Sequence, residues 1–139
     1  NAVLDVQDGF VFGGNTVSTL AGSFIKTTNA VSMNAGSFTG TGTLYINTGS
    51  TFTFNGGSVL VAIDNRGEMA IKSSIGDGSK AFASSGTGSS ISVSPTSSPI
   101  TIDFSSYSIA SPIVVSCTED VSFSNADIDF SSLNITGNA

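Results

Sequence analysis

The sequence predicts an all-β fold, a right-handed parallel β-helix of about five to six coils, and three observations support it. Hydrophobic residues alternate with polar ones in many short segments, as they do in half-buried strands. Gly, Asn and Asp separate these segments, and turns favour these residue types. Similar segments recur about 25 residues apart, which is typical of stacked coils. An antiparallel β-sandwich or jelly roll also has evenly spaced strands and is the alternative.

The clearest strand pattern lies between residues 36 and 71, where three alternating segments follow one another closely. Alternation with a period of two in segments this short indicates strands with one buried face. The hydrophobic positions are Leu44, Ile46, Phe52, Phe54, Val61, Ile63, Met69 and Ile71. Residues 47–50, 55–58 and 64–67 are rich in turn-forming residues, so we expect tight corners there.

The N-terminal residues 1–12 predict a pair of short strands that is broken at Asp8 and Gly9. The hydrophobic residues of this pair are Ala2, Leu4, Val6, Phe10 and Phe12. The pair is either the first rung of the core or a strand that is donated to a neighbouring subunit through an exposed sheet edge.

Residues 13–36 and 91–136 carry further short strands on both sides of one low-complexity interval. The interval, residues 73–90, contains only two large hydrophobic residues, Ile75 and Phe82. A long structureless loop is uncommon in a compact domain, so we expect both side chains to be buried. All 139 residues then form a single all-β domain, and a boundary within the interval is the alternative.

Two internal similarities support stacked coils. Residues 101–106 and 127–132 are identical at five of six positions. Residues 44–46 and 69–71 share their alternating pattern at nearly the same spacing along the chain. A parallel β-helix coil of this length holds three short strands and three corners. The two ends of such a helix are open edges unless another molecule covers them.

Charged residues are sparse and mostly acidic. Four basic and ten acidic residues make up 10% of the sequence, against about 25% in typical soluble domains. No Lys or Arg follows Lys80, and the absence of a basic cluster excludes nucleic acid and anionic membrane surfaces as partners. No apolar run approaches the roughly 20 residues of a membrane helix. A surface of Ser, Thr, Asn and Gly is commoner on secreted proteins, so we expect an extracellular or cell-surface location.

The residue types that catalysis uses most are scarce. The sequence has no His, which excludes Ser–His and Cys–His pairs as well as His-ligated metals. The one Cys, Cys117, cannot form an internal disulfide or a multi-cysteine metal site, and we expect it to be a small apolar residue at a strand end. We therefore expect no enzymatic activity, no cofactor and no metal site.

One pair of carboxylates could contradict this expectation. Asp103 and Asp129 occupy equivalent positions of the repeated hexamer, so they would lie about 5 Å apart in adjacent coils, with Asp127 nearby. Such a pair could serve glycoside hydrolysis or bind calcium. The simpler interpretation, which we favour, is that both carboxylates face solvent.

Two further patterns concern the surface. Short Thr runs could form a ladder that binds ice, although outward Thr residues are ordinary on strands. The residues of these runs are Thr39, Thr41, Thr43, Thr51 and Thr53. Asn134 begins the only Asn-X-Ser/Thr sequence and is a candidate glycosylation site.

Residues 55–60 and 65–71 combine Asn- and Gly-containing turns with short hydrophobic segments, and Ile-Asp-Phe-Ser-Ser at 102–106 is repeated. This general sequence pattern resembles that of β-solenoid surface proteins. The resemblance is to autotransporter passenger domains and to the β-helical stalks of bacterial and fungal cell-surface adhesins. It covers most of the chain and implies a structural or adhesive extracellular role. No diagnostic motif accompanies it, so it assigns no functional residue.

We therefore expect a non-enzymatic extracellular structural protein, either a subunit of a self-assembling surface filament or fibre or a segment of an adhesin stalk. Such a chain polymerises through its ends, and a glycan or a host surface is a candidate partner. The expected inter-subunit contact residues are Ala2, Leu4, Val6, Phe10, Phe12, Leu133 and Ile135. The alternative is a carbohydrate-binding or carbohydrate-cleaving β-helix module, for which Tyr45 and Tyr107 are the expected exposed rings.

Overall fold

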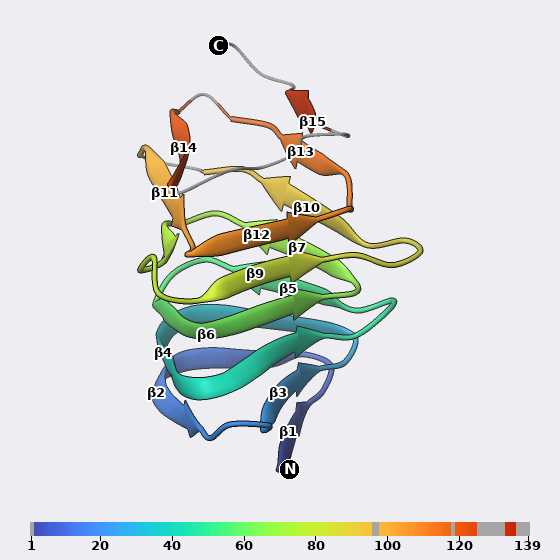
Figure 1. Ribbon diagram of the computed structural model, residues 1–139, viewed down its shortest axis with the longest axis vertical. Helices are drawn as coiled ribbons and strands as arrows, with labels where there is room; N and C mark the ends of the chain where they lie inside the picture. Colours follow the sequence, from blue (N-terminus) through green and yellow to red (C-terminus); the bar gives the residue numbers. More distant parts are fainter. Residues whose placement is uncertain (1, 96–97, 118, 125–132, 136–139) are drawn as a thin grey trace.

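The computed structural model describes residues 2–95, 98–117, 119–124 and 133–135. All regular elements in this part of the chain are β-strands, which stack into a parallel β-solenoid of about six turns (Figure 1). The strands are β1 (Val3–Val6), β2 (Phe10–Thr19), β3 (Phe24–Thr27), β4 (Ala30–Ile46), β5 (Thr51–Phe54), β6 (Ser58–Asn65), β7 (Glu68–Ile71), β8 (Ile75–Gly76), β9 (Ala81–Ser84), β10 (Ser90–Val93), β11 (Ile100–Asp103), β12 (Ser106–Ile109), β13 (Ile113–Val115), β14 (Val121–Ser124) and β15 (Leu133–Ile135). The predicted parallel β-helix is confirmed.

Each coil contributes to three faces, because a corner follows every short strand. Face A consists of β1, β3, the end of β4, the end of β6, β9 and β12. Face B consists of the start of β2, the start of β4, β5, β7, β10, β13 and β15. Face C consists of the end of β2, the middle of β4 and the start of β6, and the three-stranded sheet of β8, β11 and β14 continues it. Figure 1 shows the coils stacked along the long axis, with β1 and β2 at one end and β15 at the other.

All strand pairs among the described residues are parallel, so the antiparallel sandwich alternative is wrong. Residues in register therefore stack in columns along the solenoid axis, and alternate columns point into the core. One inward column on face A reads Leu4, Ile25, Leu44, Ile63, Phe82 and Tyr107. From Ile25 to Phe82, these side chains are at most 2% exposed.

The predicted stacking of residues 44–46 on residues 69–71 is wrong. Leu44 stacks on Ile63, and Met69 stacks on Phe52. The two segments lie on different faces, A and B, so they never become neighbours. Most inward positions of this solenoid are hydrophobic, so the hydrophobic pattern repeats from face to face as well as from coil to coil.

The low-complexity interval at residues 73–90 is part of the solenoid. It contains β8 and β9, and Ile75 and Phe82 are both buried, as predicted. The Phe82 ring packs against the Phe104 ring, with 5.1 Å between the ring centroids. The interval therefore adds core residues to successive coils.

Buried polar side chains form hydrogen bonds that connect the corners of neighbouring coils. The Asn65 side-chain amide donates hydrogen bonds to Ser84 Oγ (2.9 Å) and to the Ser90 carbonyl oxygen (3.1 Å). Asn65 Oδ1 accepts a hydrogen bond from the Gly67 backbone N–H (3.1 Å). Ser84 Oγ donates to Ser111 Oγ (2.8 Å), one coil further along the axis. Because these groups satisfy each other, the polar corner can be buried without an unpaired amide.

Candidate functional site

The most unusual surface of this protein is its first coil, where side chains of the core lie open to solvent. Leu4 is 45% exposed, although Ile25, the next residue in the same inward column, is fully buried. Within the described part of the chain, β1 pairs only with β3 and β2 only with β4. The inward side chains of this rung are therefore covered on one side only, and the outer edges of β1 and β2 have no neighbouring strand among the described residues.

Phe10 continues this open surface on face B. It stacks in register with the buried Val31 but is itself 48% exposed. Its ring contacts Phe12, whose ring contacts Phe38, with 4.7 Å between the ring centroids in each pair. A row of aromatic rings thus leads from the open end into the centre of the core.

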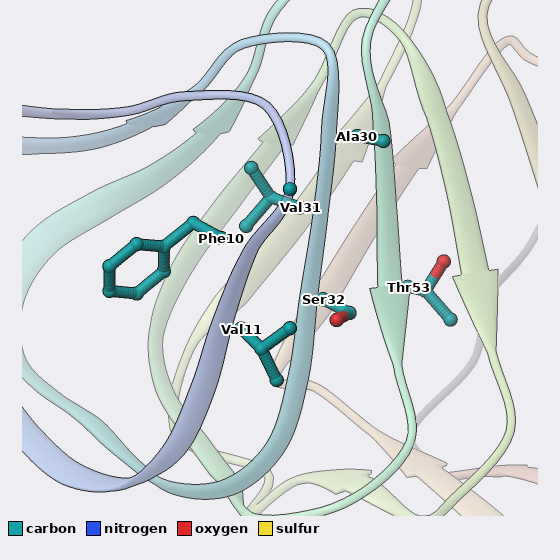
Figure 2. Close-up of a pocket in the computed structure, with 7 residues that line it drawn as sticks. Phe10, Val11, Ala30, Val31, Ser32 and Thr53 are labelled. Atoms are coloured by element: carbon teal, nitrogen blue, oxygen red, sulfur yellow. The ribbon is translucent and has the colours of Figure 1, made fainter.

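Beside Phe10 lies a shallow cavity of about 190 Å³ (Figure 2). Its lining residues are Gly9, Phe10, Val11, Ala30, Val31, Ser32 and Thr53. Figure 2 shows the Phe10 and Thr53 side chains on opposite sides of the β2 ribbon. These lining residues include no titratable side chain, so the chemistry of the cavity suits packing rather than catalysis.

Three further hydrophobic side chains near this end are exposed, and none of them is among the contact residues predicted from the sequence. Val3 and Val11 point outward on β1 and β2, and Leu20 follows the last residue of β2. Leu20 is 78% exposed, the largest value among the exposed large hydrophobic residues. The available signal was Val11, whose column continues with Ser32, Thr53, Ala70 and Ser92 in the next coils.

The contact residues predicted from the sequence fall into three groups. Ala2, Leu4 and Phe10 are exposed at the open end. Val6 and Phe12 are buried at 5% and 4% exposure, beneath the residues that a partner would touch. The backbones of Leu133 and Ile135 belong to β15, in register with Ile113 and Val115 of β13. A contact role stays a prediction for all seven residues.

The acidic residues of the first coil are held by groups from the second. Asp5 accepts a hydrogen bond from the Thr28 hydroxyl (3.0 Å) and lies 3.8 Å from the Lys26 ammonium. Asp8 accepts a hydrogen bond from the Ala30 backbone N–H (3.4 Å). These contacts tie β1 and the following turn to β3 and β4, so the open rung has a defined shape.

The predicted stack of Asp103 on Asp129 does not match the strand register. Gly76 and Ser124 occupy the two positions beside Asp103 in its ladder. Asp127 and Asp129 lie outside the described residues. Within the described ranges, no group of three or more His, Cys, Asp or Glu side chains could hold a metal ion.

The Thr residues of the predicted runs do not stack on one another in the described strands, so they form no ladder from coil to coil there. Thr39 lies between Ser18 and Leu60, and Thr53 lies between Ser32 and Ala70. Cys117 is a free thiol, partly buried against the core just after β13. The backbone of Asn134 lies in β15, and the Thr136 of its sequence motif is outside the described residues.

Tyr107 is turned toward the core, so the prediction of an exposed ring at this position is wrong. Its hydroxyl lies 2.7 Å from the Ile102 carbonyl oxygen and 3.0 Å from that of Ser124, and it accepts a hydrogen bond from the Phe104 N–H (3.1 Å). Burial raises the pKa of the Tyr107 hydroxyl. Tyr45, by contrast, points outward on face A beside Lys26 and Asp64, with which it is in register.

No family model, no curated protein and no solved structure matches this chain. In the part of the chain that the structure describes, no helix is long and apolar enough to cross a membrane. The geometry of the first coil and of the outward faces therefore carries the functional argument.

Proposed function

We propose that this chain is a non-enzymatic structural protein of the cell exterior, which assembles with further copies through the open end of its solenoid into a filament, a fibre or an adhesin stalk. One observation carries the proposal: the core of the first coil is uncovered at Leu4 and Phe10, beside two strand edges that have no neighbour among the described residues. The end coil of another solenoid could cover this surface. Its strand edges would pair with β1 and β2, and its inward hydrophobic side chains would pack on Leu4 and Phe10.

The energetics favour docking of a whole rung over a small contact. Fully burying a Val, Leu or Phe side chain contributes about 1.5–3 kcal/mol. Five exposed or half-exposed side chains, Val3, Leu4, Phe10, Val11 and Leu20, would therefore contribute roughly 5 kcal/mol. Association costs at least about 4 kcal/mol in lost motional freedom. Side-chain burial alone therefore leaves little net free energy of association. Stable docking also requires the backbone hydrogen bonds of β1 and β2.

The rest of the surface suits an extended, repeated structure outside the cell. One outward column on face B carries the small uncharged side chains of Ser32, Thr53, Ala70 and Ser92 on four successive coils. With only 10% charged residues in the sequence, little repulsion opposes the approach of copies. The Ser- and Thr-rich composition supports an extracellular location.

The test compares the wild-type chain with a Leu4→Asp/Phe10→Asp double variant by light scattering after size-exclusion chromatography and by negative-stain electron microscopy. We expect concentration-dependent oligomers or fibres from the wild type and monomers from the double variant. Ser58→Asp is the matched control, because Ser58 is exposed on a middle coil, and it should assemble like the wild type. A wild-type chain that stays monomeric at all concentrations would refute self-assembly through this end.

Substitution is a sharper test than truncation. Deleting residues 1–12 would make β3 and β4 the new edge and uncover Ile25 and Val31, which are now buried. The truncated chain would thus present another bare rung. Asp side chains at positions 4 and 10 keep the first coil in place and remove only its hydrophobic surface.

A further inference from the structure

The outward column of face A contrasts with the column of small, uncharged side chains at Ser32, Thr53, Ala70 and Ser92 on face B. It reads Asp5, Lys26, Tyr45 and Asp64 across four successive coils, in register. Neighbouring positions in such a column are about 4.8 Å apart. Arg66 joins the column from the next corner, so this surface holds two of the four basic residues of the chain.

A small cavity of about 220 Å³ lies at the start of this column. Val3, Phe24, Lys26 and Tyr45 line it. The Phe24 and Tyr45 rings meet edge to face, with 6.4 Å between their centroids and 84° between their planes. Pockets for drug-sized ligands measure about 300–1,000 Å³, so this cavity fits a single small ring.

Two ion pairs border the aromatic rings on opposite sides. On one side Lys26 Nζ lies 3.8 Å from Asp5 Oδ2. On the other side Arg66 Nε donates to Asp64 Oδ1 (2.7 Å) and Arg66 Nη2 donates to Asp64 Oδ2 (3.4 Å). The hydrogen bond and charge of Asp64 raise the pKa of Arg66. The fork of Arg66 holds the Asp64 carboxylate in one orientation, beside Tyr45.

We propose that this surface, the Tyr45 site, binds a neutral sugar ring. A pyranose has an apolar C–H face and a rim of hydroxyl groups, which matches an aromatic ring between two polar pairs. The C–H face packs on Tyr45, a sugar hydroxyl donates a hydrogen bond to the neighbouring Asp64 carboxylate, and the Lys26 ammonium donates to a sugar oxygen.

The charges of the site decide between a neutral and an acidic sugar. Asp5 and Asp64 contribute two negative charges, and Lys26 and Arg66 contribute two positive charges, so the site carries no net charge. The whole chain has a net charge of −6, which repels anions at long range. A neutral saccharide therefore fits better than a uronic or sialic acid. This inference does not rest on end-to-end assembly, because the Tyr45 site lies on the side of the solenoid.

The test is a ¹⁵N-HSQC NMR titration, in the Leu4→Asp/Phe10→Asp background that should stay monomeric, with the methyl pyranosides of glucose, galactose and mannose and with N-acetylglucosamine. The variants described below are made in this background, which takes the place of the wild type in each comparison. Each sugar is added to about 50 mM, well above the millimolar dissociation constants of weak binding. We expect at least one sugar to shift the amide signals of Phe24, Lys26, Tyr45 and Asp64. Amide signals on face B should stay in place.

Matched variants locate the binding to this surface. Tyr45→Ala and Asp64→Asn should each weaken binding at least about tenfold. Tyr45→Phe keeps the ring and should bind within about threefold of the wild type. The control Thr53→Ala, on face B, should bind like the wild type. Dispersed amide spectra verify that each variant is folded.

Three outcomes would overturn the proposal. The first is the absence of shifts with all four neutral sugars. The second is binding that Tyr45→Ala leaves unchanged, which would place the sugar elsewhere. The third is binding of glucuronic acid alone, lost in Lys26→Gln, which would assign the Tyr45 site to an anion. Because the titration uses a variant designed not to assemble, the result stands apart from the test of assembly.

Discussion

Tyr107 illustrates how one side chain connects three strands. Its ring packs against Phe82, Phe104 and Phe123, with centroid distances of 6.0–6.3 Å. Its hydroxyl reaches the backbone of Ile102 before the corner and of Ser124 on β14. The hydroxyl has one proton and therefore donates to one carbonyl oxygen at a time, while it accepts from the Phe104 N–H.

Replacing Tyr107 by Phe should lower the free energy of unfolding by about 1–2 kcal/mol at neutral pH, because partly buried backbone groups lose a partner. The pKa of Tyr107 is raised in the folded state by burial, so folding favours the neutral phenol. This contribution is fully present below the unfolded pKa of about 10 and is lost as the pH rises through the folded pKa. The difference in stability between the wild type and Tyr107→Phe should therefore shrink at high pH.

Urea unfolding at neutral pH and above pH 10, together with tyrosinate absorbance, measures this effect. In the wild type one of the two tyrosines should titrate above the ordinary range, and Tyr107→Phe should remove that late step. A stability difference that is constant up to the highest pH would contradict the predicted role of the neutral hydroxyl.

Some of these residue-level features could be predicted from the sequence, and others could not. The inward position of Tyr107 could not be predicted, because its hydroxyl is satisfied by backbone groups of residues that only the fold brings near it. The burial of Ile75 and Phe82 followed from the scarcity of hydrophobic residues around them. Thr27 is fully buried, and its hydroxyl has no hydrogen-bond partner among the described residues. No sequence pattern distinguishes such a Thr from the outward ones.

At the scale of elements, the corners determine how one strand changes face. Between faces C and A, β4 bends at Gly40, where φ is +107°. A Cβ at this position would clash with the Thr19 carbonyl oxygen in the preceding coil. Thr19 also holds this corner with its side chain, which accepts from the Gly42 N–H (2.9 Å) and donates to the Thr39 carbonyl oxygen (3.0 Å). The corner leaves no room for any side chain on Gly40.

Gly40→Ala should therefore destabilise the solenoid by about 3 kcal/mol or more, since backbone strain adds to a clash with backbone atoms. Thermal unfolding followed by circular dichroism would measure this loss. Gly49→Ala is the matched control: its φ is +76°, but nothing lies within 4 Å of the added Cβ. Strain alone should cost about 1 kcal/mol there. Equal losses in the two variants would show that the close approach of the coils at Gly40 has no energetic effect.

The sequence predicted short strands and corners better than it predicted which strands are neighbours. Turn residues at 47–50 mark a real corner, and of the corner predicted at 64–67 only residues 66 and 67 lie between strands, because Asp64 and Asn65 belong to β6. The register depends on coil length, which is much shorter between the stacked pair Phe52 and Met69 than between the stacked pair Ile75 and Ile102. Corners of different sizes absorb this variation. One fixed offset along the chain therefore relates similar segments that do not stack, such as residues 44–46 and 69–71.

At the scale of the whole molecule, stability depends on neighbouring coils, as in other solenoids. Middle strands such as β5 and β7 have neighbours on both sides, whereas β1 has one in the described part of the chain. Amides of β1 and the start of β2 should exchange with deuterium fastest, and those of β5 and β7 slowest. Hydrogen exchange followed by NMR or mass spectrometry checks this gradient. Protection of β1 equal to that of β5 in a monomer would contradict the expected lower stability of the first coil.

The same measurement separates an uncovered end from a covered one. If copies dock through the first coil, exchange at β1 should slow as the protein concentration rises, and it should stay fast in the Leu4→Asp/Phe10→Asp variant. The open end itself could be predicted from the sequence, because a coiled stack of strands must have two edges. The Tyr45 site could not, since its residues come from four coils and only the register brings them together.

The parallel stacking of coils also has a mechanical consequence. The backbone hydrogen bonds between coils run along the long axis, so tension on this axis loads one rung at a time rather than all rungs together. A coil of roughly 20 residues is about 5 Å thick when folded and about 70 Å long when pulled straight. A stalk made of such coils lengthens in discrete steps from its least supported end, while the remaining rungs keep their shape and the surfaces they present.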